Sequence, residues 1–147
     1  MTVLVGVDGS AGSHAAVRLA AQEARYRSAP LVAVMAYSGD RALGAPGARP
    51  LATLRTSEDE RAATEAALRD LVHDALGADA GNVTCRAVTG LPGRALVEAA
   101  RTVNAQLVVL TTRSDTSMAR VLGPVSQHVL RHAACPVLIV PDGCRAG

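Results

Sequence analysis

Short apolar runs recur along the chain and alternate with stretches that have the spacing of amphipathic helices. Four runs are almost wholly apolar, which is typical of strands buried on both faces of a parallel sheet; they cover residues 2–8, 31–36, 107–110 and 136–140. The helical spacing predicts helices over residues 11–27, 57–77, 92–103 and 123–132. In the last of these helices we expect Val125, Val129 and Leu130 to be buried.

A fifth apolar segment, residues 83–89, alternates between apolar and polar side chains more than the other four do. Alternation predicts an edge strand with one wetter face. The order of elements predicts an α/β fold, a doubly wound open sheet of five parallel strands with helices on both faces. At 147 residues, the chain suits one domain over residues 1–147.

Polar residues and residues that favour turns separate these elements. Asp8, Gly9 and Ser10 follow the first strand and suit a turn and a helix start. Residues 37–56 are rich in Gly, Ala, Pro and Arg and have no period. Loops of this length are uncommon in compact domains, so this segment is either a functional lid or a variable insertion that has no function of its own.

Composition narrows the classes of function. The net charge is +2, with acidic and basic residues interleaved, which is typical of an ordinary solvated surface. The chain has no Trp or Phe and only two Tyr, which argues against base stacking on a single-stranded nucleic acid. All 15 basic residues are Arg, so a Schiff-base lysine and a phosphate-loop lysine are both excluded.

Cysteine usage and hydropathy indicate a cytosolic protein. Cys85, Cys135 and Cys144 lie far apart and form no CxxC pair, which favours reduced thiols. No signal peptide precedes the first strand, and no apolar run approaches the ~18–20 residues that span a bilayer. We therefore expect a cytoplasmic protein with no nucleic-acid or membrane partner.

Three segments together resemble the universal stress protein family. They are Val3-Leu-Val-Gly-Val-Asp-Gly-Ser10, Thr89-Gly-Leu-Pro-Gly93, and the segment from Gly123 to Val140 that contains Gly-Pro-Val-Ser and Cys-Pro-Val-Leu-Ile-Val. The resemblance implies a Rossmann-like fold of five strands, a homodimer joined through the last strand (residues 136–140), and a role in stress survival. Members of one subclass bind ATP through a loop of pattern Gly, two residues, Gly, nine residues, Gly, then Ser or Thr.

The chain departs from that loop pattern at most of its positions. Thr111 and Ser114 stand where the first two glycines are expected, and eight residues instead of nine separate Ser114 from Gly123. Pro124 replaces the final Ser or Thr, which removes a hydroxyl group and a backbone N–H. Asp115 adds a negative charge that would repel a triphosphate.

Several residues could still bind a ligand at this place. Arg113 and Arg120 could compensate with positive charge, although a generic polar loop has a similar composition. The resemblance places Asp8 against the nucleotide and Ala36 near an adenine ring, but Asp8 also suits a turn and Ala36 a core position. The candidate cofactor-binding residues are Asp8, Ala36, Thr111, Arg113, Ser114, Gly123 and Val125.

The chain contains no recognisable catalytic motif: GxSxG, HExxH, GxGxxG after the first strand and GxxxxGK[ST] are all missing. His128, His132 and Cys135 have a spacing that superficially resembles zinc ligands, but no fourth ligand is evident. We therefore expect no metal and assign no catalytic residues.

These observations favour a cytosolic, dimeric stress-response module in which ATP binding is impaired or absent and no cofactor is held. The alternative is an ATP-binding nucleotide switch or slow ATPase of the same family, using Asp8, Arg113 and Arg120. A weaker third hypothesis is a plain dimerisation domain that regulates an unknown protein partner.

Overall fold

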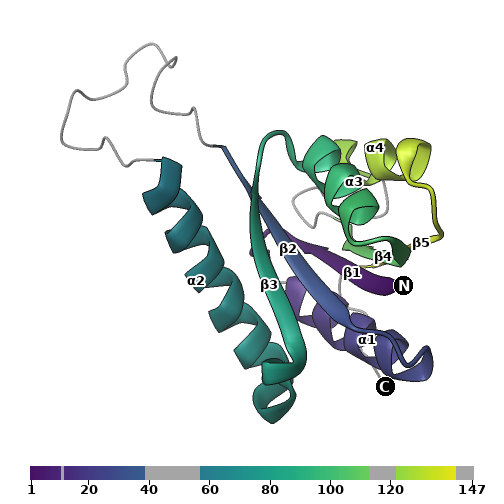
Figure 1. Ribbon diagram of the computed structural model, residues 1–147. Helices are drawn as coiled ribbons and strands as arrows, with labels where there is room; N and C mark the ends of the chain where they lie inside the picture. The colour runs from purple at the N-terminus through teal and green to yellow at the C-terminus, as the bar shows by residue number, and fades with distance from the viewer. Residues whose placement is uncertain (11, 39–56, 113–121, 142–147) are drawn as a thin grey trace, which may run out of the picture.

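The computed structural model describes residues 1–10, 12–38, 57–112 and 122–141 (Figure 1). The elements in chain order are β1 (Thr2–Val7), α1 (Ser13–Tyr26), β2 (Leu31–Tyr37), α2 (Ser57–Leu76), the 3-10 helix η1 (Gly77–Asn82), β3 (Val83–Thr89), α3 (Pro92–Thr102), β4 (Ala105–Thr111), α4 (Pro124–His132) and β5 (Val137–Val140). The predicted order of strands and helices is confirmed. The short helix η1 was not predicted, because its sequence carries no apolar period.

The five strands form one sheet in the order β3-β2-β1-β4-β5, and every neighbouring pair is parallel. The predicted α/β fold with a doubly wound parallel sheet is therefore confirmed. Strand β3 lies at one edge, as its alternating pattern indicated, and β5 lies at the other. The chain runs outward from β1 through β2 to β3, then returns to β4 on the other side of β1.

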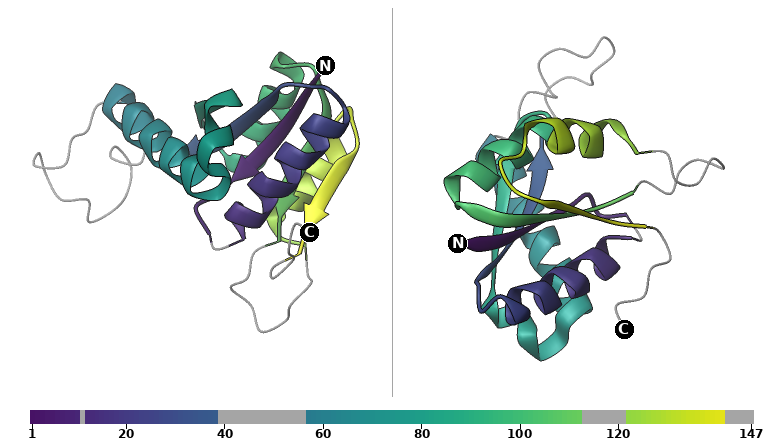
Figure 2. Two further views of the ribbon diagram at one scale, coloured as in Figure 1. Left: turned by 90° about the horizontal axis from the view of Figure 1, so that it is seen from below. Right: turned by 90° about the vertical axis from the view of Figure 1, so that its right-hand side faces the viewer.

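Helices cover both faces of the sheet, with α1 and α2 on one face and α3 and α4 on the other (Figure 2). Successive side chains of a strand point to opposite faces. In β1, Val3 and Val5 therefore pack with α1 and α2, whereas Leu4 packs with α3 and α4. Each face buries Val, Leu and Ala side chains, which makes a core without Trp or Phe.

One predicted core residue is wrong. Leu130 is 45% exposed, whereas Val129 beside it is fully buried on the α3 and α4 face of the sheet. Helix α4 is only nine residues long and packs beside α3 at the rim of the sheet, so its buried stripe is too narrow to include Leu130. Most of the predicted loop, residues 39–56, lies outside the described residues.

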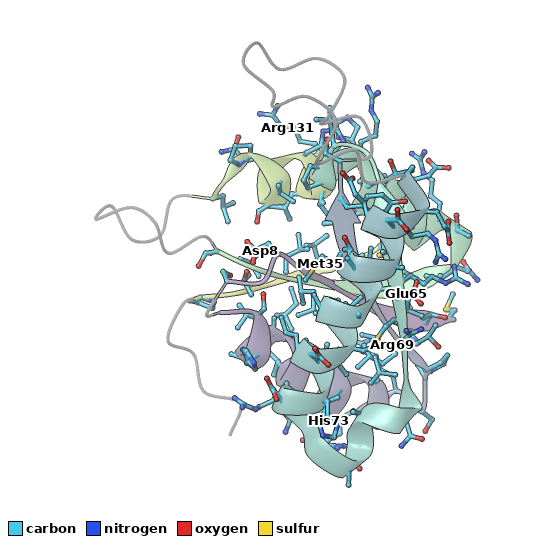
Figure 3. The ribbon with its side chains drawn as sticks, turned by 90° about the vertical axis from the view of Figure 1, so that its left-hand side faces the viewer. Asp8, Met35, Glu65, Arg69, His73 and Arg131 are labelled. Atoms are coloured by element: carbon cyan, nitrogen blue, oxygen red, sulfur yellow. The ribbon has the colours of Figure 1, made fainter. Side chains whose placement is uncertain are left out.

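No helix within residues 1–10, 12–38, 57–112 and 122–141 is long and apolar enough to cross a membrane. The described helices are instead amphipathic, and the side chains labelled on α2 in Figure 3 (Glu65, Arg69 and His73) are charged or polar.

Candidate functional site

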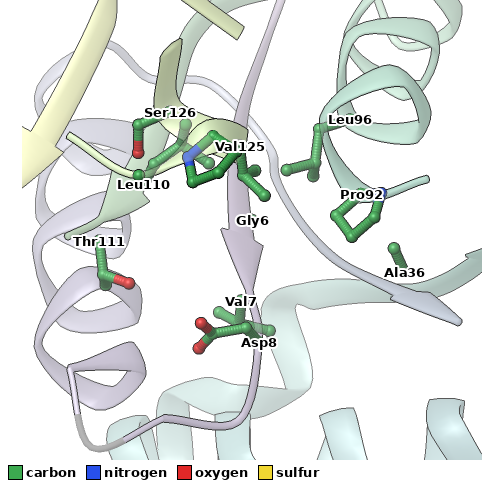
Figure 4. Close-up of a pocket in the computed structure, with 12 residues that line it drawn as sticks. Gly6, Val7, Asp8, Ala36, Pro92, Leu96, Leu110, Thr111, Val125 and Ser126 are labelled. Carbon is green, nitrogen blue, oxygen red and sulfur yellow. The ribbon is translucent and has the colours of Figure 1, made fainter. Parts of the chain in front are cut away.

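A cavity of about 280 Å³ opens at the carboxyl ends of β1 and β4 (Figure 4). This is the point where the strand order reverses, which is where open α/β sheets bind ligands. The residues that line it are Gly6, Val7, Asp8, Ala36, Pro92, Leu96, Leu110, Thr111, Gly123, Pro124, Val125 and Ser126. Most of these side chains are aliphatic, so the cavity suits a largely apolar group held by a few polar contacts.

The base of the cavity depends on Gly6, near the carboxyl end of β1. A Cβ atom at this position would lie 2.8 Å from Leu110 Cδ2 and 2.9 Å from Leu96 Cδ2. The absence of a side chain therefore lets two leucines from β4 and α3 close over the strand. A larger residue at position 6 would force the ends of both leucine side chains to move.

The side of the cavity nearest α1 is organised by the Asp8 carboxylate. Its Oδ1 atom accepts a hydrogen bond from the Ser10 backbone N–H at 2.9 Å and another from the Ser13 hydroxyl at 3.2 Å. Ser13 is fully buried in the first turn of α1, whereas Asp8 itself is exposed. This geometry satisfies the turn and helix-start chemistry expected of Asp8, and it also holds the carboxylate at the cavity mouth.

The opposite side is formed by the start of α4. Gly123 precedes the helix in an extended conformation and, as its N-cap residue, makes no side-chain capping hydrogen bond, and Pro124 occupies the first turn. Pro124 has no N–H, so the first turn offers one donor fewer than a Ser or Thr at that position would.

Helix α4 is held against α3 at a glycine. A Cβ atom on Gly93 would lie 2.9 Å from His128 Cβ, so the two helices approach closely because position 93 has no side chain. This contact sets how near α4 lies to the Pro92 end of α3, and therefore the width of the cavity between them.

Ser126 projects from α4 into the cavity lining and is only 4% exposed. Figure 4 shows Ser126 and Val125 on one side of Gly6, with Leu96 and Pro92 on the other.

Five of the seven predicted binding residues line this one cavity: Asp8, Ala36, Thr111, Gly123 and Val125. Arg113 and Ser114 lie outside the described residues. Sequence reasoning missed Gly6, Leu96, Leu110 and Ser126. Gly6 could have been found, because a glycine inside a buried strand often marks a close approach. The leucines and Ser126 carry no such signal.

The histidines of α4 form a structural pair. The rings of His128 and His132 stack with centroids 4.2 Å apart, and His132 Nδ1 lies 2.9 Å from the His128 carbonyl oxygen. Burial raises the pKa of the Cys135 thiol, which disfavours the thiolate form that binds metals. The described residues contain no group of three or more His, Cys, Asp or Glu side chains that could hold a metal ion.

The sequence of residues 1–141 matches the model of the universal stress protein family. The chain belongs to this family. It is 35% identical over 140 residues to the universal stress protein Rv2005c of Mycobacterium tuberculosis, a match that covers 94% of this chain and 47% of that protein. It is 36% identical over 144 residues to Rv1636 of the same organism, which covers 95% of this chain and 94% of that protein. The chain thus spans about half the length of Rv2005c and nearly all of Rv1636.

Solved structures agree with the fold. A universal stress protein in complex with cAMP superposes with a TM-score of 0.69 at 33% identity, covering 97% of this chain and 98% of that one. The universal stress protein UspA from Lactobacillus plantarum superposes with a TM-score of 0.71 at 26% identity, covering 95% of this chain and 97% of that one. The five-stranded parallel sheet with helices on both faces is therefore shared with these proteins.

Proposed function

We propose that this stress-response protein is a dimeric binding or regulatory module of the cytoplasm and that its switch-point cavity does not hold ATP tightly. The observation that carries the proposal is the start of α4, where Pro124 stands in the first turn and the N-cap residue Gly123 makes no side-chain capping hydrogen bond. A triphosphate at a helix start depends on backbone N–H groups and hydroxyls that converge on its oxygens.

The lining of the cavity supports this proposal. The apolar lining favours burial of a ring or an aliphatic group over burial of phosphates.

The test is the nucleotide content and ATP affinity of the purified full chain. We expect the protein to purify without nucleotide and to show no saturable ATP binding in isothermal titration calorimetry at micromolar concentrations. ATP binding in the micromolar range or tighter would overturn the proposal.

A second candidate is a nucleotide-binding switch or slow ATPase at the same cavity. It is favoured by the 33% identical universal stress protein that was solved in complex with cAMP. In this case the Asp8→Asn substitution should abolish nucleotide binding, because the carboxylate lies at the cavity mouth. An unchanged affinity in the variant would count against this candidate.

Dimerisation through the last strand is the second part of the proposal. Strand β5 is at the sheet edge, and Val137, Leu138 and Ile139 are partly exposed. An apolar edge strand with unpaired backbone groups favours pairing with a second copy. A dimer of this kind would also present one joint surface to an unknown protein partner.

Analytical ultracentrifugation of two charge variants tests this interface. Leu138→Arg should shift the protein to a monomer, and Thr84→Arg on the opposite edge strand β3 should leave the dimer unchanged. Circular dichroism must show that both variants are folded. A wild-type monomer, or a folded Leu138→Arg dimer, would refute dimerisation through β5.

A further inference from the structure

A second cavity, of about 320 Å³, lies at the amino ends of β2 and β3, at the opposite end of the sheet from the first cavity. The ends of α1 and α2, the turn into β2 and the helix η1 enclose it. Its apolar lining belongs to the core between the sheet and the helices α1 and α2, or packs against that core: Ala21, Ala24, Leu31, Leu76 and Val83. A space of this size suits one small molecule.

Two side chains of opposite charge line this second cavity. Arg25 Nη1 lies 3.8 Å from Asp79 Oδ2, and each side chain is 66% exposed. An ion pair this long and this exposed contributes little to stability, because water screens both charges and the paired side chains lose conformational freedom. Both groups can therefore exchange their mutual contact for contacts with a ligand at a small cost in free energy.

The turn after α1 adds a hydroxyl group in a backbone conformation that disfavours serine. The Ser28 N–H donates to the Arg25 carbonyl oxygen at 3.1 Å, and the Ala29 N–H donates to the Ala24 carbonyl oxygen at 2.9 Å, which is the pattern of a Schellman motif. Ser28 has the left-handed φ of 49° that glycine usually adopts in this motif, because glycine has no Cβ. Ser28 also lines the cavity, so it supplies a hydroxyl where glycine would end the helix more favourably.

We propose that this second cavity binds a small zwitterion with an aliphatic body, the class of the free aliphatic amino acids. The carboxylate of the ligand pairs with the Arg25 guanidinium, and its ammonium group pairs with the Asp79 carboxylate. Its aliphatic side chain covers the apolar lining. The Ser28 hydroxyl and the Asn82 amide both donate and accept, so each can bond to either charged group.

The experiment follows the backbone amide chemical shifts of the full chain by NMR during a titration with L-leucine. Saturable shifts should appear at Arg25, Ser28 and Asn82, with a dissociation constant of about 1 mM or lower. Two analogues that each lack one charge are the ligand controls: isocaproate lacks the ammonium group, and isoamylamine lacks the carboxylate. Each should bind at least about fivefold more weakly than L-leucine, because one charged contact is lost.

A pair of charge variants tests the protein side of the contact. Asp79→Asn removes the negative charge that pairs with the ammonium group and should weaken L-leucine binding by at least about fivefold. Glu98→Gln is the matched control, since Glu98 pairs with Arg101 at the same 3.8 Å, with side chains 72% and 61% exposed, and does not line this cavity. Its affinity for L-leucine should equal that of wild type.

Ser28→Gly separates recognition from folding. Glycine suits the left-handed backbone at this position, so Tm should stay the same or rise, whereas loss of the hydroxyl should weaken L-leucine binding by about two- to fivefold. An unchanged affinity, or a fall in Tm together with weaker binding, would refute the role of Ser28 in the site.

The remaining outcomes decide the proposal as a whole. It is overturned if L-leucine gives no saturable shift up to about 10 mM, or if all three compounds bind equally, which would mean that apolar surface alone is recognised. Shifts confined to Asp8, Gly123 and Val125 would place the ligand in the first cavity, and equal losses in Asp79→Asn and Glu98→Gln would trace the effect to net charge; either result refutes the second site. None of these results depends on the affinity for ATP, so a failure here leaves the proposed function standing.

Discussion

The two sides of the cavity are built in opposite ways. On the α1 side, the Asp8 carboxylate accepts hydrogen bonds from the Ser10 backbone N–H and from the buried Ser13 hydroxyl. On the α4 side, Pro124 stands in the first helical turn, the N-cap residue Gly123 makes no side-chain capping hydrogen bond, and Ser126 lines the cavity. Both sides start a helix next to a β-strand, and both contain a buried serine.

The difference lies in the side-chain hydrogen bonds at each helix start. A polar group that is satisfied within the chain stabilises the folded state. The Asp8 contacts therefore contribute to the stability of the α1 side. The start of α4, with Pro124 in its first turn, has no comparable contact from its N-cap residue, and it is the part of the cavity on which the proposed loss of ATP binding depends.

The largest effect on stability should come from a substitution that displaces helix α4 from α3. In Gly93→Ala the new Cβ would lie 2.9 Å from His128 Cβ, an atom near the backbone that cannot swing aside. We expect α4 to shift from α3 and the free energy of unfolding to fall by about 1–3 kcal/mol, as in other overpacked sites. Chemical denaturation measures this change.

Gly81→Ala is the control for Gly93→Ala, because a Cβ on Gly81 would meet no atom within 4 Å. Equal stability of the two variants would show that the close approach of α3 and α4 does not position the cavity wall.

The next effect concerns the satisfied side. Ser13→Ala leaves the Asp8 carboxylate without its hydroxyl donor. The free energy of unfolding should fall by about 1–2 kcal/mol. A hydrogen bond to a fully buried carboxylate would contribute more, but Asp8 is exposed to water. If urea denaturation shows no loss for Ser13→Ala, the Ser13 contact does not stabilise the α1 side of the cavity.

A substitution that returns hydrogen-bonding groups to the start of α4 should change the stability less but should clearly change ATP binding. Pro124→Ser returns a backbone N–H and adds a hydroxyl at the first helical turn. We expect stability to change by roughly 0.5 kcal/mol or less, since proline is also favourable at this position. ATP affinity, measured by calorimetry, should rise above the wild-type value.

Pro124→Ala is the matched variant, because it returns the N–H without the hydroxyl. If neither Pro124→Ser nor Pro124→Ala gains affinity for ATP, the residue at position 124 is not what limits phosphate binding.

The smallest effect on stability should come from removing the exposed ion pair between Glu58 and Arg61. Comparison with Ser13→Ala shows how much more a contact made by a buried side chain contributes to stability. A hydrogen bond from Arg61 and its positive charge hold the pKa of Glu58 below its ordinary value at the start of α2. A lowered pKa contributes stability above the unfolded pKa, and this contribution is lost as the pH falls through the folded pKa. The pair is exposed, so the effect should be slight and should vanish in high salt.

Thermal melts of wild type and Glu58→Gln at neutral and acidic pH measure this difference. The two proteins should differ slightly at pH 7 and converge at low pH. A gap that widens as the pH falls would contradict the assigned direction of the pKa shift.

Much of the fold could be predicted from local pattern. Continuous apolar runs and helical spacing identified the five strands and the helices between them, and the alternation in Val83–Thr89 identified an edge strand. Five candidate residues, from Asp8 to Val125, line one cavity because strand ends in a parallel sheet meet at the same edge. The apolar runs, the helical spacing and the strand ends are each set by residues close together in the chain, so the sequence alone predicts them.

Tertiary packing decided the rest. The exposure of Leu130 and the burial of Ser126 depend on which stripe of α4 faces α3 and the sheet, and that is fixed by the close contact of Gly93 with His128. The closure of Leu96 and Leu110 over Gly6 joins three elements that are distant in the chain. The sequence by itself determined the order of the elements and where their ends meet. Only the packed structure decided which side chains of α4 are buried and which are exposed, because that depends on contacts between distant segments.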